Sequence, residues 1–207
     1  SSQATTDALL GLSSQNAASL HSAGETLDNL VAASSSEAST DKLLDRIVVD
    51  GLDLYKAGES LDVLAKTDSS TIKDLYGNVG TTTLADSAFG VANVYDAAIA
   101  SGDDAIDLLK DGLSVGQLLS VPKVDGEVLY DLGVGVVTLA GNGVTASELT
   151  SASASDLLDG YSASNIYNTT NFGVSDLANA GVGAGALLND ASAGELLTDS
   201  NGRDMLL

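Results

Sequence analysis

The 207-residue chain has no cysteine and no tryptophan, and it contains one histidine, one proline and two phenylalanines. The absence of cysteine excludes disulfide bridges, Cys/His zinc sites and Cys-His nucleophilic pairs. It is compatible with microbial export and also with the cytosol. Since aromatic residues make up only 4% of the chain, a conventional core would have to be built mainly from leucine, valine and alanine.

Basic residues are scarce. Eight lysines and arginines stand against 29 aspartates and glutamates, which gives a formal net charge of −21. Such a balance argues against nucleic acid or an anionic membrane as a partner. Most of the carboxylates are expected on a solvated surface.

Catalytic and cofactor motifs are missing as well. His21 lies in a Ser/Ala-rich stretch and is interpreted as an exposed polar residue. The glycine-rich stretches lack the strand and helix context of a dinucleotide fold, and no phosphate-loop motif is present. No run of about 18 apolar residues occurs. We therefore expect no enzyme, and no catalytic, cofactor-binding or metal-ligating residue is assigned.

What the sequence does contain is a six-residue phrase, apolar–Ser/Thr/Gly–x–x–polar–Leu, that recurs about every ten residues. Its clearest copies are residues 144–149, 152–157, 161–166, 172–177, 182–187 and 191–196. Weaker copies are residues 49–54, 59–64, 70–75, 79–84, 89–94, 113–118, 124–129 and 134–139. Around residues 101–106 the register is ambiguous, because Ser101 and Asp104 fit the cap whereas Ile106 lies one position late.

The phrase has the spacing of a helix start. If its second position is the N-cap, its fifth is N3, and the two residue types can form a capping box or a close variant of it. The pairs are Thr145 with Glu148, Ser153 with Asp156, Ser162 with Asn165, Ser114 with Gln117, and Ser192 with Glu195. The first and sixth positions form a hydrophobic staple, so Val144 should pack on Leu149 and Phe172 on Leu177.

A stop signal follows in several copies. Glycine comes two to four residues after the leucine, as at Gly160 and Gly181, where a left-handed C-cap would end the helix. Each unit should then form a helix of about two turns, roughly 10 Å long.

These signals predict a mainly α fold, a solenoid-like stack of short helices built from tandem repeats of about ten residues. The helical array should cover residues 49–207, and residues 1–48 should be divergent Ser/Ala-rich repeats. The alternative is a β-solenoid, supported by the valine-rich run 134–144 and by the triplet Thr81-Thr82-Thr83. Adjacent leucines such as Leu157-Leu158 break the alternation of a strand and favour helix.

In residues 144–197 the phrase resembles the short apolar-Ser-Ala-x-acid-Leu repeats of microbial surface and secreted repeat proteins. The resemblance implies a style of repeat and no particular ligand. The tail, residues 200–207, begins another unit and stops at its leucines. We expect either a piece of a longer array or a processed subunit whose end is covered by the next subunit. We therefore expect an extracellular or cell-surface structural protein, a filament subunit or adhesin stalk, whose partners are copies of itself. Asn168 begins an Asn-x-Thr sequon.

The alternative function is an acidic repeat module that binds divalent cations, mineral or a glycan. Calcium is the cation to consider, and the closest carboxylate clusters are Asp103-Asp104 with Asp107 and Asn189-Asp190 with Asp199. Neither has the spacing of an EF-hand loop.

Overall fold

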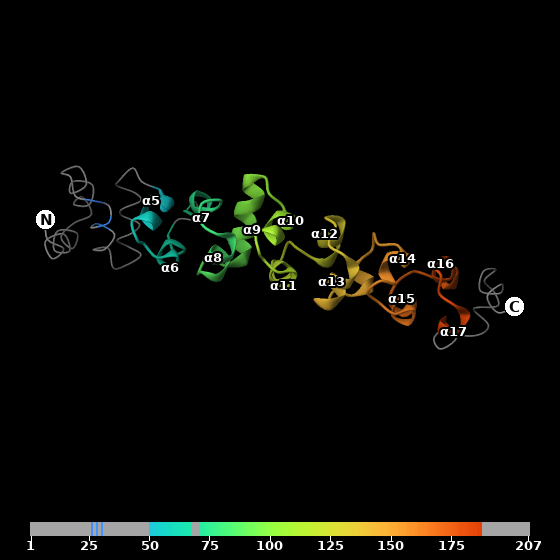
Figure 1. The fold of residues 1–207 in the computed structure, drawn as a ribbon. Helices are drawn as coiled ribbons and strands as arrows, with labels where there is room; N and C mark the ends of the chain where they lie inside the picture. Colours follow the sequence, from blue (N-terminus) through green and yellow to red (C-terminus); the bar gives the residue numbers. More distant parts are fainter. Residues whose placement is uncertain (1–25, 27, 29, 31–49, 68–70, 188–207) are drawn as a thin grey trace. The chain divides into compact units, whose positions relative to one another are not determined.

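The computed structural model describes residues 26, 28, 30, 50–67 and 71–187 (Figure 1). Within these residues the chain is mainly helical and has no strand, which confirms the mainly α prediction. A single isolated bridge joins Tyr76 and Val79 in the described part. The β-solenoid alternative is wrong there, because the valine-rich run carries a helix at Val136–Gly141 and the threonine triplet begins another at Thr81–Asp86.

The chain divides into two compact units, Ser1–Leu113 and Ser114–Leu207. The predicted boundary between residues 48 and 49 lies outside the described residues. In the first unit the helices are α5 (Gly51–Lys56), α6 (Leu61–Leu64), α7 (Thr71–Leu75), α8 (Thr81–Asp86), α9 (Gly90–Ser101) and α10 (Ala105–Lys110). In the second they are α11 (Val115–Leu119), α12 (Gly126–Asp131), α13 (Val136–Gly141), the 3-10 turn η1 (Ala146–Glu148), α14 (Ala154–Leu157), α15 (Ala163–Thr169), α16 (Val174–Asn179) and α17 (Ala184–Leu187).

The side chains at the sixth position of the phrase, mostly leucines, form the centre of the core. A short helix can bury only one face, and the leucine at N4 lies on that face together with the residues at N′ and N1. Val134, Val136 and Leu139 of α13 show the pattern, with all three buried and the leucine 0% exposed. The side chains that are 0 to 1% exposed at the sixth position are Leu54, Leu64, Leu75, Leu84, Val94, Leu118, Leu129, Leu139, Leu149, Leu157, Ile166, Leu177 and Leu187.

The predicted helix starts are largely confirmed. Ser114 and Gln117 bond reciprocally, as do Ser153 and Asp156, so both form capping boxes. Ser162 accepts from the Asn165 N–H at 3.1 Å, which is one half of the box. The Thr145 N–H donates to Glu148 Oε2 at 2.6 Å. Ser192 and Glu195 lie outside the described residues.

The ambiguous register near residue 101 is settled in favour of Asp104. The Asp104 carboxylate accepts from the N–H groups of Ile106 and Asp107, whereas Ser101 is the last residue of the preceding helix α9. The sixth position of this copy is therefore Leu108, which is fully buried, and Ile106 is only half-buried.

Several helix ends share a second pattern, which places a glycine at a fixed distance from the buried leucine. A glycine with positive φ lies four residues after the buried leucine, and the residue after that glycine donates its N–H to the leucine carbonyl. After Leu139, for example, Gly143 has φ 88° and Val144 N–H donates to the Leu139 oxygen at 3.1 Å. The glycines at this spacing are Gly58, Gly112, Gly133, Gly143 and Gly181. Gly181 confirms the prediction made for it.

Gly160 corrects the same prediction, because it does not have a positive φ. A Cβ at this position would meet Val136 Cγ1 at 2.9 Å and the Val136 carbonyl oxygen at 3.0 Å. Glycine is needed here for the close approach of two backbones and not for a left-handed turn.

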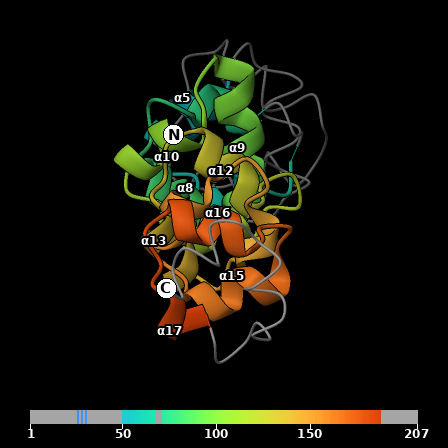
Figure 2. The same cartoon turned by 90° about the vertical axis from the view of Figure 1, so that its right-hand side faces the viewer.

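Within each unit, some helices contact their direct neighbours, as α8 does α9, and several also contact the next but one along the chain. In the first unit α5 packs against α7, and in the second α14 packs against α16 and α15 against α17. Figure 1 shows α14 and α16 in an upper row and α15 and α17 in a lower row, and Figure 2 again places α15 and α17 below α16. Hydrogen bonds follow the same separation: the Gly51 N–H donates to Asp74, 23 residues away, and Tyr130 donates to Asp156, 26 residues away.

Candidate functional site

The second unit contains an irregular stretch where the repeats do not keep their spacing. The buried side chains follow at steps of eight residues from Leu149 to Leu157, nine to Ile166 and eleven to Leu177. The stretch begins at η1, which is a single 3-10 turn of three residues, and includes α15, which has seven. Helices of unequal length cannot cover one another completely, so a hollow is left between them.

Thr170 ends α15 in place of a glycine. It lies four residues after Ile166, at the position of the stop glycine in other repeats. Its hydroxyl donates to the Ile166 carbonyl at 2.7 Å and accepts from the Phe172 N–H at 3.2 Å. A threonine side chain that bonds the backbone on both sides in this way ends a helix without a left-handed residue. The loop that follows is thereby held in one conformation.

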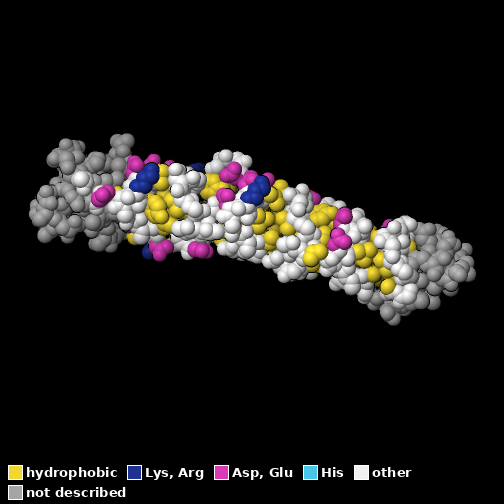
Figure 3. All heavy atoms as spheres, viewed as in Figure 1, with side chains coloured by type: hydrophobic (Ala, Val, Ile, Leu, Met, Phe, Trp, Pro, Cys, Tyr) yellow, Lys and Arg dark blue, Asp and Glu magenta, His cyan; other side chains and the backbone are white. Residues whose placement is uncertain are grey.

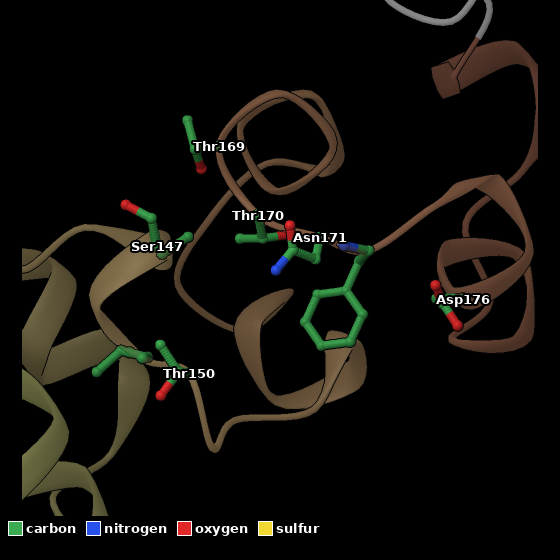
Figure 4. Close-up of a pocket in the computed structure, with 9 residues that line it drawn as sticks. Ser147, Thr150, Thr169, Thr170, Asn171 and Asp176 are labelled. Atoms are coloured by element: carbon green, nitrogen blue, oxygen red, sulfur yellow. Dashed lines mark hydrogen bonds between the residues drawn. The ribbon is translucent and has the colours of Figure 1, made fainter.

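The hollow lies between η1, this loop and the start of α16, and it has a volume of about 420 Å³ (Figure 4). Ala146 and Leu149, each 1% exposed, form an apolar floor. The other lining residues carry hydroxyl, amide and carboxylate groups or an aromatic ring: Ser147, Thr150, Thr169, Thr170, Asn171, Phe172 and Asp176.

Most polar groups of the hollow are held by neighbours. Thr150 Oγ1 donates to Glu127 Oε1 at 2.9 Å, and Thr169 Oγ1 donates to the Asn165 carbonyl at 2.7 Å. Asp176 Oδ2 accepts from the Gly173 N–H at 2.9 Å. The side chain of Asn171 has no hydrogen bond to another described residue, and in Figure 4 its amide is directed toward the side on which Ser147 and Thr150 lie.

Carboxylates gather beside this hollow, on α12 and α14. Ser151 links two of them, since its N–H donates to Glu127 Oε1 at 2.8 Å and its hydroxyl to Asp131 Oδ1 at 2.8 Å. Burial by itself would raise the pKa of the Glu127 carboxyl, but the hydrogen bonds from Thr150 and Ser151 outweigh it and hold that pKa below its usual range. A hydrogen bond from Ser153, and a further one from Tyr130, lower the pKa of Asp156.

The predicted calcium cluster in the first unit is engaged in other roles. Asp104 and Asp107 form the reciprocal cap of α10, and Lys110 Nζ lies 2.8 Å from Asp107 Oδ1. Asp103 accepts from the Tyr76 hydroxyl at 2.9 Å. In the described part of the chain, no group of three or more His, Asp or Glu side chains is arranged to hold a metal. The second cluster, Asn189, Asp190 and Asp199, and the single His21 lie outside the described residues.

The sequon residue Asn168 is exposed on α15, and its Nδ2 donates to the Ser164 carbonyl at 2.9 Å. None of the residues that line the hollow was identified from the sequence. The spacing of the repeats alone would not have found them, because separations of nine and eleven residues between buried side chains also occur from Leu75 to Leu84 and from Leu118 to Leu129.

Comparison with protein-family models, with curated proteins and with solved structures finds no match for this chain. Among the described residues, no helix combines the length and the apolar character needed to cross a bilayer.

Proposed function

We propose that the chain is an extracellular structural protein, a helical solenoid that serves as the subunit of a self-assembling filament or as the stalk of an adhesin. The observation that carries this proposal is the contact of helices with the next but one along the chain, seen for α5 with α7 in the first unit and for α14 with α16 and α15 with α17 in the second. A solenoid with two repeats in each turn produces such contacts, at separations of about twenty residues or slightly more.

The energetics of the repeats support stacking as the source of stability. Helices as short as α6, with four residues, and α11, with five, are not stable alone in water. Their buried leucines must therefore be covered by neighbouring turns. Burying one leucine side chain contributes about 1.5–3 kcal/mol, and the contribution is repeated at every turn.

The same geometry supports association between copies. In a solenoid the outermost turn has no neighbour on one side, so its apolar face can be covered by the first turn of another molecule. This contact is heterologous, and when it does not close into a ring it extends into a filament. Figure 3 shows Asp and Glu side chains scattered over the face in view, and like charges of this kind oppose contact along that side.

Electron microscopy of the purified full chain at neutral pH tests the proposal. We expect regular filaments whose length grows with protein concentration. A Val137→Glu variant is the matched control, because Val137 is 62% exposed on the side of α13 and its substitution should leave filament length unchanged. Dispersed monomers at every concentration would contradict the filament proposal.

A second candidate function is an acidic module that binds cations, mineral or a glycan. The carboxylates of Glu127 and Asp131, joined through Ser151, favour it. A chelator separates the two functions. Under the structural proposal, removal of calcium leaves the helical circular dichroism signal and the polymer length unchanged, whereas a cation-dependent module loses both.

A further inference from the structure

We propose that the hollow between η1, the loop after α15 and α16 is a binding site for a neutral saccharide. This inference concerns a ligand site on the second unit and goes beyond the structural role proposed above. It rests on the composition of the lining, on the way the loop is held and on the volume of the space.

The lining matches a molecule with many hydroxyl groups and an apolar ring face. The hydroxyl oxygens of Ser147 and Thr169 can accept hydrogen bonds, and the Asn171 amide can both donate and accept, in one small space. The two hydroxyls are themselves bonded to Thr145 and to the Asn165 carbonyl. Ala146 and Leu149 offer an apolar floor, and Phe172 offers an aromatic ring for the C–H groups of a sugar. Six of the nine lining residues carry polar groups, a larger share than in the mostly apolar wall of most small-ligand sites, and this suits a ligand rich in hydroxyls.

The charge of the lining residues narrows the class of polar ligand that the hollow can bind. No Lys, Arg or His lines the hollow, and its one ionisable side chain is the carboxylate of Asp176. With a formal net charge of −21 on the whole chain, an anion such as a phosphate or a nucleotide is repelled. A calcium ion needs about six to eight oxygen ligands, usually several of them carboxylates, and a single carboxylate does not supply them. A neutral polyhydroxyl compound is not repelled by the negative charge and does not need several carboxylate ligands.

The loop is arranged before any ligand arrives. Thr170 bonds the backbone on either side of itself, and the Gly173 N–H is bound to Asp176. Asn171 therefore lies between two fixed neighbours while its own side chain is bound to no described residue. A ligand that bonds this amide therefore has to order the Asn171 side chain but not the backbone that carries it.

The volume sets the size of the ligand. At about 420 Å³ the hollow lies at the lower end of the range of roughly 300–1,000 Å³ found for small-molecule sites. This size is suited to one or two sugar rings. Since the hollow lies at the surface and its exposed residues include Ser147, Thr169 and Asn171, we expect a dissociation constant of about 1 mM.

Saturation-transfer NMR on the full chain, with glucose, galactose, N-acetylglucosamine and maltose as separate probes, tests the site. The method reads the ligand signal, so it works on filaments and on dispersed chains alike, and its outcome is independent of the proposed filament role. We expect transfer to at least one of the four sugars. Absence of transfer to all four at concentrations of about ten times the expected dissociation constant would overturn the proposal.

Two variants locate the binding. Asn171→Ala should weaken it about tenfold or more, because it removes a donor and an acceptor aimed at the ligand. Ser155→Ala is the matched control, since Ser155 is an exposed residue on α14 that does not line the hollow, and it should leave binding unchanged. Thermal unfolding of both variants by circular dichroism checks that neither is misfolded. Equal transfer to Asn171→Ala and to the unmodified chain would overturn the assignment.

Discussion

Helices α9 and α13 come from repeats with the same pair of residue types at the start, Phe89-Gly90 in one case and Val134-Gly135 in the other. Gly135 is the N-cap of α13, whereas α9 begins at Gly90 itself, after Phe89. Yet α9 has 12 residues and α13 has six. The start of a repeat therefore does not decide the length of its helix.

The position of the stop glycine decides it. In α13, Gly143 lies four residues after the buried Leu139 and adopts φ 88°. In α9, the matching position after Val94 is Ala98, which continues the helix and is itself fully buried. The stop comes one turn later at Gly102, with φ 95°, where the Asp103 N–H donates to the Ala98 carbonyl at 3.0 Å. One glycine placed four residues further along thus adds a turn of helix.

The largest expected effect comes from the buried side chain that both repeats share at the sixth position. Leu139→Ala should lower the free energy of unfolding by about 2–5 kcal/mol, because it leaves a cavity in a core built from one leucine for each turn. Val94→Ala should cost less, since it removes only two methyl groups. Chemical denaturation measures both, with Val137→Ala as the exposed control. Equal losses in Leu139→Ala and Val137→Ala would refute the description of the core.

The stop signal is tested by Gly143→Ala. An alanine at φ 88° costs about 1–2 kcal/mol, because its Cβ crowds the following carbonyl oxygen. Gly141→Ala is a closely matched control in the same repeat: Gly141 lies within α13 without a positive φ, and a Cβ there meets nothing within 4 Å. Thermal unfolding should separate the two variants. If they are equally stable, the left-handed glycine is not what ends α13.

A glycine introduced inside α9 tests whether the spacing from the buried residue sets the end of the helix. Ala98→Gly places glycine at the spacing used by α13 and should cost about 0.5–1 kcal/mol through backbone entropy alone. We expect it also to shorten the helix, which would appear as faster hydrogen exchange at the amides of residues 99–102. Ala100→Gly carries the same entropic cost at an exposed position of the same helix without the stop spacing. Identical exchange in the two variants would contradict the spacing rule.

The smallest expected effect on stability comes from Glu148, the acidic partner of Thr145 at the start of η1. Hydrogen bonds from the Thr145 side chain and backbone hold the pKa of Glu148 below its ordinary value of 4.5. Because the folded state binds this proton more weakly, the stabilisation is present above about pH 4.5 and is lost as the pH falls through the lowered pKa. The difference in melting temperature between the unmodified chain and Glu148→Gln should thus shrink from pH 7 to pH 3. Asp159→Asn, at an exposed position after α14, is the control.

Much of the local structure follows from short-range signals in the sequence. The caps at Ser114 and Ser153, the buried leucines and the stop at Gly181 depend on residues within one turn of each other, so a single repeat contains the information. The greater length of α9 also depends on a local signal, because Ala98 stands where other repeats have the stop glycine. The expectation of a two-turn helix in every unit does not take this alanine into account.

Other features depend on contacts between distant repeats and could not be read from spacing. The role of Gly160 is set by the backbone of Val136, 24 residues earlier. The hollow in the second unit needs η1 and the loop after α15 to meet, although more than twenty residues separate Ser147 from Asn171. The predicted staple is consistent at Val144 and Leu149, which are both buried, whereas Phe172 is only half-buried because it also lines the hollow.

The contacts of α14 with α16 and of α15 with α17 have an evolutionary consequence for the proposed solenoid. In a solenoid with two repeats in each turn, loss of a single repeat of about ten residues would transfer the later helices to the opposite row, where their partners do not match. Loss or duplication of a pair, about twenty residues, would keep each helix in its row. Genes for such chains are therefore expected to grow and shrink by doublets, and orthologues of different length should differ by even numbers of repeats.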